Sequence, residues 1–360
     1  MPFKPIAIHL PQFHPIPEND EWWGKGFTEW TNVAKAKPLF KGHYQPQLPA
    51  DLGFYDLRLA ETRAAQAAMA KQYGIYGFCY YHYWFHGKRL LQQPVDEIIR
   101  TGQPDFPFML CWANGSWTRT WDGNEDILIE QTYSADDDAA HIQHLVTYFK
   151  DNRYIKIDNK PVLAVCRTEM LPDAAATAAL WRNAVKAAGF DDLYLVKMEM
   201  FEAGVPPEKI GFDAAAEFQP DWRNFPPQQR KPWQRIANRL GLHTSSVYAR
   251  HRLIDYAALA KKMLAKPVPS YKFFPGITPG WDNTPRKKKG GLILKDNTPE
   301  KFEYWLKEAL QKYAPVSTNE NFFFINAWNE WAEGNHLEPC TRWGTQYLEA
   351  VSRQFSQQQK

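Results

Sequence analysis

The sequence predicts an α/β protein, a (β/α)8 TIM barrel with long βα loops. Short apolar runs alternate with helical patterns eight times along the 360 residues, as in parallel βα units. Polar and aromatic residues gather after the first, second, third, seventh and eighth runs, at the end where βα barrels carry their active sites. A doubly wound open sheet is the runner-up fold, but no Gly-rich phosphate turn follows an early run.

Each element of the barrel has its own signal in the chain. The strands are short apolar runs, and we expect them at 5–10, 75–85, 106–112, 161–166, 193–199 and 213–218, from 271, and from Phe322. The helices are Ala-rich or amphipathic segments, and we expect them at 57–72, 94–101, 136–150, 174–188, 256–265, 299–313 and 345–355. Together they predict one catalytic domain over residues 1–360, with a basic loop inserted at about 221–252.

The last apolar run ends in a way that folding alone does not require. It begins at Phe322 and leads into amides, tryptophans and carboxylates. Because side chains alternate along a strand, Glu330 shares a face with Asn326 and Trp328. Glu333 can join that face only if the chain bends after Trp331.

Gly334 and Asn335 permit this bend. Glu330 and Glu333 would then meet beside aromatic surface at the mouth of a strand, as general acid and base catalysis on a sugar requires. The alternative is a pair of surface acids that cap a helix. The surrounding tryptophans favour burial, which would raise the carboxyl pKa values.

Aromatic residues make up 15% of the chain and suit stacking on sugar rings, although they also suit a large aromatic core. On the second strand, alternation separates Tyr81 from His82 and Trp84, and we expect His82 and Trp84 to reach the barrel mouth. Indole rings would stack on the sugar while Asn and Asp bind its hydroxyls. The full set of predicted substrate-binding residues is Tyr81, His82, Trp84, Trp112, Asn114, Trp121, Trp281, Asp282, Asn326, Trp328 and Asn329.

Cysteine and histidine spacing predicts neither a metal nor a cofactor. The four cysteines, Cys79, Cys111, Cys166 and Cys340, are dispersed and form no CxxC pair. The histidines lack ligand spacing with acids. We expect buried, reduced thiols.

The charge is small overall but unevenly distributed. Net charge is +3, yet residues 221–252 hold seven Lys or Arg against one acid, and 286–289 add four more. This local excess does not predict a nucleic-acid partner. We expect an oligosaccharide or polysaccharide substrate and no obligate protein partner.

The start of the chain resembles no leader peptide, and no segment is apolar enough to span a bilayer, so we expect a cytoplasmic protein. One hypothesis is that the basic insertion, with Trp222 and Trp233, rests on an anionic membrane surface. A solvated loop is the alternative.

Several long motifs make the chain similar to a known family. They are LPQFH at 10–14, WGKGFTEW at 23–30, GFCYYHYW at 77–84, WDG at 121–123 and WNEWAEG at 328–334. On these motifs the chain resembles the WbsX-type family from about residue 5 to 350, and that family looks like a relative of glycoside hydrolase family 99. The resemblance implies a (β/α)8 barrel and a role in bacterial surface-polysaccharide metabolism, such as O-antigen or lipopolysaccharide biosynthesis.

The resemblance also implies roles for the two glutamates. Glu330 would withdraw the proton of a sugar 2-hydroxyl, which attacks the anomeric carbon to give a 1,2-anhydro sugar, and Glu333 would be the acid and base. The chain departs from similar sequences at Gly115 and Ser116, where they tend to carry Glu-Asn, so the sugar could differ. We therefore expect a retaining, metal-independent glycosidase acting on α-linked residues. The alternatives are a glycosyltransferase and a non-catalytic glycan-binding protein.

Overall fold

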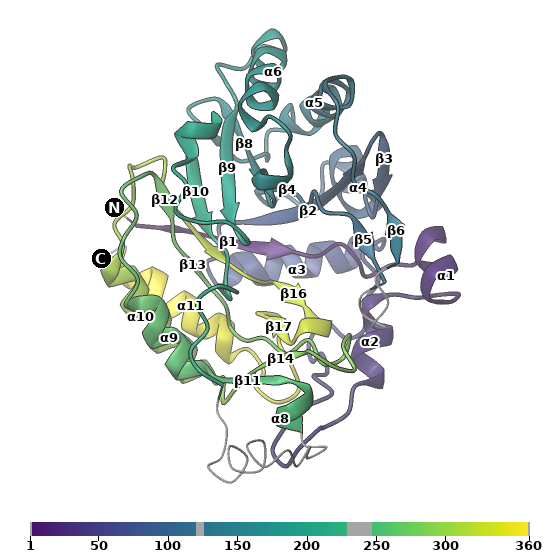
Figure 1. Ribbon diagram of the computed structural model, residues 1–360, viewed down its shortest axis with the longest axis vertical. Coiled ribbons are helices and arrows are strands. Elements are labelled where there is room, and N and C mark those ends of the chain that lie inside the picture. Colours follow the sequence, from purple (N-terminus) through teal and green to yellow (C-terminus); the bar gives the residue numbers. More distant parts are fainter. Residues whose placement is uncertain (1, 120–125, 229–246, 359–360) are drawn as a thin grey trace.

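The computed structural model describes residues 2–119, 126–228 and 247–358 (Figure 1). Nine parallel strand segments follow one another in the order β12-β10-β9-β8-β4-β2-β1-β15-β13. Their bounds are β1 (Lys4–His9), β2 (Gly77–Phe85), β4 (Phe108–Trp112), β8 (Lys160–Val165), β9 (Tyr194–Glu199), β10 (Ala214–Glu217), β12 (Phe273–Phe274), β13 (Gly276–Ile277) and β15 (Phe322–Ile325).

The sheet closes through the two shortest segments. Strand β12 pairs with β10, and β13 pairs with β15, while only Pro275 lies between β12 and β13. Proline has no N–H to donate, but the Pro275 carbonyl still accepts a bond from the backbone N–H of Phe324 at 2.8 Å. Segments β12 and β13 together thus serve as the seventh strand, and the predicted (β/α)8 barrel is confirmed.

Helices cover the outside of the barrel, with α5 and α6 beyond one side of the sheet and α9, α10 and α11 beyond the other (Figure 1). Several start at the residue that their caps predict, since the side chains of Ser134, Asp173, Asp255 and Thr298 each accept a backbone N–H of the first turn. The helices are α3 (Ala60–Gln72), α4 (Gln93–Thr101), α5 (Ala135–Phe149), α6 (Ala174–Ala187), α9 (Tyr256–Leu264), α10 (Pro299–Lys312) and α11 (Gln346–Gln357).

The fifth βα unit departs from this pattern, because among the described residues only the 3-10 turn η2 (Pro207–Ile210) links β9 to β10. Short elements fill the other loops. They are α1 (Pro17–Trp23), α2 (Glu29–Lys35), β3 (Lys88–Leu90), β5 (Trp117–Thr118), β6 (Ile127–Ile129), β7 (Lys156–Ile157), η1 (Thr168–Met170), α8 (Val247–Arg250), β11 (Arg252–Asp255), β14 (Leu292–Lys295), β16 (Asn329–Glu330), η3 (Trp331–Glu333) and β17 (Asn335–His336).

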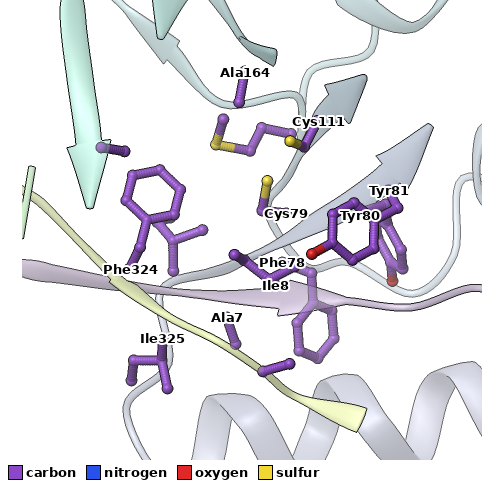
Figure 2. Packing of buried hydrophobic residues seen from close by; sticks show 14 of the residues in the cluster. Ala7, Ile8, Phe78, Cys79, Tyr80, Tyr81, Cys111, Ala164, Phe324 and Ile325 are labelled. Atoms are coloured by element: carbon purple, nitrogen blue, oxygen red, sulfur yellow. The ribbon is translucent and has the colours of Figure 1, made fainter. Parts of the chain in front are cut away.

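Strand register decides which side chains fill the barrel. Cys79 of β2 lies beside Ile8 of β1 and Met109 of β4, and all three are fully buried. Figure 2 shows the Cys79, Cys111 and Phe324 side chains converging on one side of the sheet, whereas Ala7 and Ile325 point to the other. Alternate residues of β2, including Tyr81, therefore face the barrel axis, and those between them face the helices.

All four cysteines are buried and none forms a disulfide, with 3.2 Å between the sulfurs of Cys111 and Cys166. The predicted contact of Trp121 and most of the predicted basic insertion, including Trp233, lie outside the described residues. In the part of the chain that is described, no helix has the length and apolar character to cross a membrane.

Candidate active site

The turn after the eighth strand carries the two predicted catalytic carboxylates. The bend that Glu333 needs begins at Trp331, because residues 331–333 form η3 and Gly334 follows with φ +55°. A Cβ at Gly334 would lie 2.7 Å from Nε2 of Gln47 and 3.0 Å from Cβ of Asp282, so a larger residue would clash as well as strain the backbone. This tight turn brings Glu330 and Glu333 to one cation.

That cation is Arg286, from the loop after the seventh strand. Its Nη2 lies 3.1 Å from Oε2 of Glu330, and its Nη1 lies 2.8 Å from Oε1 of Glu333. The same Nη2 lies 3.0 Å from Oε2 of Glu29, at the first turn of α2. One guanidinium, from the loop after the seventh strand, thus joins three carboxylates that come from two other loops.

Burial sets the electrostatics of this cluster. It raises the pKa of Glu330 to about 8, against the opposing attraction of Arg286 and with the help of Glu333 and Glu29. Burial likewise raises the pKa of Glu333, again opposed by Arg286. The same carboxylates raise the pKa of Arg286, which stays charged. One cation facing three carboxylates favours a proton shared by Glu330 and Glu333 near neutral pH.

Both catalytic candidates keep one carboxylate oxygen for a ligand. Arg286 binds Oε2 of Glu330 and Oε1 of Glu333, and the second oxygen of each makes no hydrogen bond with any residue that the structure describes. Glu29 is different, because it is fully buried and its Oε1 has no partner among the described residues. Glu29 therefore binds Arg286 without lining the cleft itself.

The glutamate pair opens into a cleft of about 570 Å³ at the C-terminal end of the barrel strands. Its walls come from the loops after six strands. The lining residues are Tyr81, Tyr83, Ala113, Asn114, Gly115, Trp117, Cys166, Arg167, Met200, Phe201, Phe218, Trp222, Trp281, Asn283, Arg286, Lys287, Glu330 and Glu333. A second cavity of about 250 Å³, bordered by Trp23, shares Tyr83, Trp117, Arg286 and Glu330 with it.

Three of the predicted substrate-binding residues line this cleft. Tyr81 faces it from β2, and Trp281 packs edge-on against Trp222, with 5.0 Å between ring centroids. Asn114 borders it too, but its amide already bonds Arg167, accepting the backbone N–H at 2.8 Å and donating to the carbonyl at 2.9 Å. Asn114 thus fixes the shape of the loop more than it offers groups to a ligand.

Three predicted contacts are wrong, because their side chains point out of the barrel. His82 and Trp112 occupy paired positions on β2 and β4, and both pack against His141 of α5. Trp84 stacks on His141, and its indole N–H donates to Asp137 at 2.9 Å. Alternation along β2 correctly placed His82 and Trp84 on one face of the strand. The face that reaches the mouth of the barrel is the other one, with Tyr81 and Tyr83.

Three residues of the eighth-strand stretch also serve the fold and do not line the cleft. Trp328 is fully buried against Phe78, with 5.0 Å between ring centroids. Asn329 clamps Leu10, accepting its N–H at 2.7 Å and donating to its carbonyl at 3.0 Å. Asn326 donates to the carbonyl of Gln219 at 2.7 Å.

Asp282 likewise faces away from the cleft. Its Oδ2 accepts bonds from Nε2 of His43 and from Nε2 of Gln45, both at 2.7 Å. Its backbone N–H donates to the carbonyl of Glu333. Asp282 therefore links the long first loop to the turn that carries the two carboxylates. The predicted contact of Asp282 with a sugar in this cleft is wrong.

Sequence reasoning missed the residue at the centre of the site. Arg286 heads a run of basic residues, a pattern that usually marks a solvated surface, yet its side chain is only 9% exposed. Glu29 lies in the 23–30 motif. An acidic residue between Thr28 and Trp30 was the one feature of the sequence that could have indicated a role for Glu29. Among the described residues, no group of three His, Cys, Asp or Glu could hold a metal ion.

Comparison with solved structures agrees with the barrel. The fold resembles a glycoside hydrolase-like protein with TM-score 0.61 and 15% identity, covering 98% of this chain and 94% of that one. It also resembles the GH99 endo-alpha-mannosidase from Bacteroides thetaiotaomicron in complex with bis-tris propane, with TM-score 0.57 and 14% identity, covering 98% and 96% of the two chains. At these identities the likeness concerns the fold alone.

Sequence comparison is more specific. Uncharacterized protein WxcX from two strains of Xanthomonas campestris pv. campestris is 43% identical over 362 residues, covering 98% of this chain. The chain spans about half the length of these relatives, 49%. The model of the family described as glycosyltransferase WbsX matches residues 5–351, and the chain belongs to that family.

Proposed function

We propose that the protein is a metal-independent, retaining glycosidase acting on α-linked residues of a bacterial surface polysaccharide. One observation carries the proposal. Glu330 and Glu333 meet across Arg286 and line a cleft at the C-terminal end of the barrel strands. The barrel's likeness to a GH99 endo-alpha-mannosidase supports the same reaction class by analogy of fold.

The proton state of the pair suits the first step. A shared proton leaves one carboxylate as a base and the other as an acid, because burial opposes two adjacent charges. Glu330 takes the proton of the sugar 2-hydroxyl as that oxygen attacks the anomeric carbon. Glu333 protonates the departing glycosidic oxygen, and a 1,2-anhydro sugar forms.

The second step reverses the proton transfers. Glu333, now ionised, removes a proton from water, which attacks the anomeric carbon and opens the three-membered ring. Glu330 returns its proton to O2. Two inversions at the anomeric carbon leave its configuration retained. The cluster keeps its total charge through both steps, because one glutamate gains a proton from the substrate or product as the other gives one up, and Arg286 stays beside them as the fixed counter-charge.

Glycosyl transfer is the second candidate, and the description of the matching family favours it. Transfer would use the same two carboxylates, with the hydroxyl of another glycan in place of water. A glycan-binding protein without turnover is the third candidate. It would leave unexplained why two carboxylates are held buried beside a cleft at a cost in stability.

The test is incubation of the wild type and Glu333→Gln with α-linked mannan and rhamnan oligosaccharides, read by mass spectrometry. Hydrolysis predicts shortened products that disappear in the variant. Lengthened products, or products that form only with an activated donor sugar, would make the protein a transferase. Products that Glu333→Gln leaves unchanged would overturn the assigned pair.

A further inference from the structure

The cleft holds more positive charge than its catalytic pair requires. Its lining includes three cations, Arg167, Arg286 and Lys287, and two carboxylates, Glu330 and Glu333. Arg286 is already matched by these carboxylates and by Glu29. Arg167, whose Nε pairs with Glu169, and Lys287 are therefore the two cations that the rest of the cleft presents.

Lys287 follows Arg286 directly and lines the same cleft as Glu330 and Glu333. It is half-buried, and it forms no ion pair with any residue in the described ranges. Its charge helps to lower the pKa of Glu333 against the effect of burial, so it lies close enough to act on that carboxylate. Burying a cation partly without a partner carries a cost unless a ligand supplies the counter-charge.

Arg167 lies on the wall formed by the loop after β8 and is held in place from three sides. Its backbone N–H bonds Asn114, its Nε donates to Glu169 at 3.0 Å, and its guanidinium lies 4.5 Å from the ring centroid of Phe201. Its two terminal nitrogens make no hydrogen bond with other described residues. A fixed guanidinium with both terminal N–H groups available suits a carboxylate or phosphate.

Gly115 keeps this guanidinium open to the cleft. A Cβ at this position would lie 3.6 Å from Cδ of Arg167 and 3.8 Å from its Nη1. A longer side chain would therefore extend over the arginine or displace it. Glycine leaves the space beside the guanidinium to a ligand.

We propose that the cleft selects glycans with an anionic substituent, a carboxylate or a phosphate, which Arg167 and Lys287 bind beside the sugar that is cleaved. The inference rests on the proposed function, because it names the substrate class of the same site. A neutral glycan would displace water from Arg167 and Lys287 without replacing the hydrogen bonds that the water makes with these cations. An anionic substituent restores them with charge-assisted hydrogen bonds, and the exposed Phe201 offers a ring face nearby.

The experiment measures binding by calorimetry, with Glu333→Gln as the background so that ligands persist. The ligands are an α-linked neutral oligosaccharide, its hexuronate counterpart and a counterpart bearing a phosphate monoester. Arg167→Gln and Lys287→Gln are the test variants. Lys289→Gln is the matched control, because it removes the same charge from an exposed position outside the cleft lining.

We expect at least one anionic ligand to bind ten-fold or more tightly than the neutral one, with the preferred ligand identifying the substituent. Arg167→Gln and Lys287→Gln should each remove most of that advantage, while Lys289→Gln keeps it. Equal affinity for neutral and anionic ligands, or an equal loss in Lys289→Gln, would overturn the inference. Cleavage of neutral glycans by the wild type with no anionic preference would leave the proposed function standing. Absence of binding and cleavage for every glycan would overturn both.

Discussion

Nη1 of Arg286 lies 2.8 Å from Oε1 of Glu333, although 47 positions separate the two residues in the chain. The contact joins the loop after the seventh strand to the turn after the eighth. Because Nη2 of the same arginine bonds Glu330 and Glu29, the geometry of both catalytic candidates depends on one side chain.

Replacing Glu333 by Gln should lower kcat by about 10²–10⁴-fold, because an amide cannot transfer the proton. The fold should survive, since Gln keeps the volume and can still accept a bond from Arg286. Rates on a cleaved oligosaccharide, measured with Glu208→Gln as the control, would check this. Glu208→Gln is the same substitution at an exposed site in η2. A comparable loss of kcat in Glu208→Gln would therefore point to a non-specific effect.

Replacing Glu330 by Gln should increase stability at alkaline pH. Burial raises the pKa of Glu330 from 4.5 to about 8, so the folded protein holds a proton that the unfolded chain releases above pH 4.5. The wild type therefore loses free energy of unfolding as pH rises from about 4.5 to 8. An amide at position 330 does not titrate, so the variant lacks this one contribution.

The expected difference in unfolding free energy is about 2–5 kcal/mol at pH 8 and close to zero below pH 4.5. Denaturant titrations of both proteins at pH 4.5, 6 and 8 would measure it. A wild type that gains stability relative to the variant as pH rises would contradict the sign.

The barrel could be predicted because the buried strands read as continuous apolar runs and the helices carry local caps. Helices α5, α6 and α9 begin and end within one residue of the expected ranges. Alternation also grouped the aromatic residues of β2 correctly. It could not say which group faces inward, because both faces of that strand are aromatic and buried. That choice depends on the register with β1 and β4.

An ion pair between residues far apart in the chain is even harder to predict from the sequence than the orientation of a strand. Arg286 looks like part of a solvated basic run, and only the folded chain brings it to Glu29, 257 positions away. The glutamate pair was visible because both carboxylates lie in one short apolar and aromatic stretch. The cation that joins them lies in another loop.

Trp84→Phe should reduce stability and leave substrate affinity unchanged, because Trp84 packs under α5 and donates to Asp137. Loss of that buried bond should cost about 1–3 kcal/mol. Trp281→Phe should instead raise KM, since Trp281 lines the cleft. Unfolding curves and KM values of the two variants would separate the roles, and a raised KM in Trp84→Phe would contradict the outward orientation.

Glu338→Ala should destabilise the turn that carries Glu330 and Glu333. The Glu338 carboxylate accepts bonds from Tyr55 at 2.9 Å, Gln66 at 2.7 Å and Trp331 at 2.6 Å. Removing it leaves three buried donors unpaired, at a cost of about 3 kcal/mol or more. Thermal unfolding would measure this loss, with Glu349→Ala, on the outer helix α11, as a control expected to stay near wild type.

Arg286→Met should be the most destabilising of these changes, because it leaves the fully buried Glu29 charge without a partner. Breaking a buried pair in this way costs about 3–5 kcal/mol. Arg286→Lys keeps the charge but cannot reach three carboxylates as a fork, so it should fold and turn over slowly. The double variant Glu29→Gln/Arg286→Met should recover much of the lost stability, because it removes the unpaired charge. Unfolding free energies of the wild type, Glu29→Gln, Arg286→Met and the double variant form a cycle that isolates this coupling. If the two single effects simply add, Arg286 does not act through Glu29, and its place at the centre of the cluster would have to be abandoned.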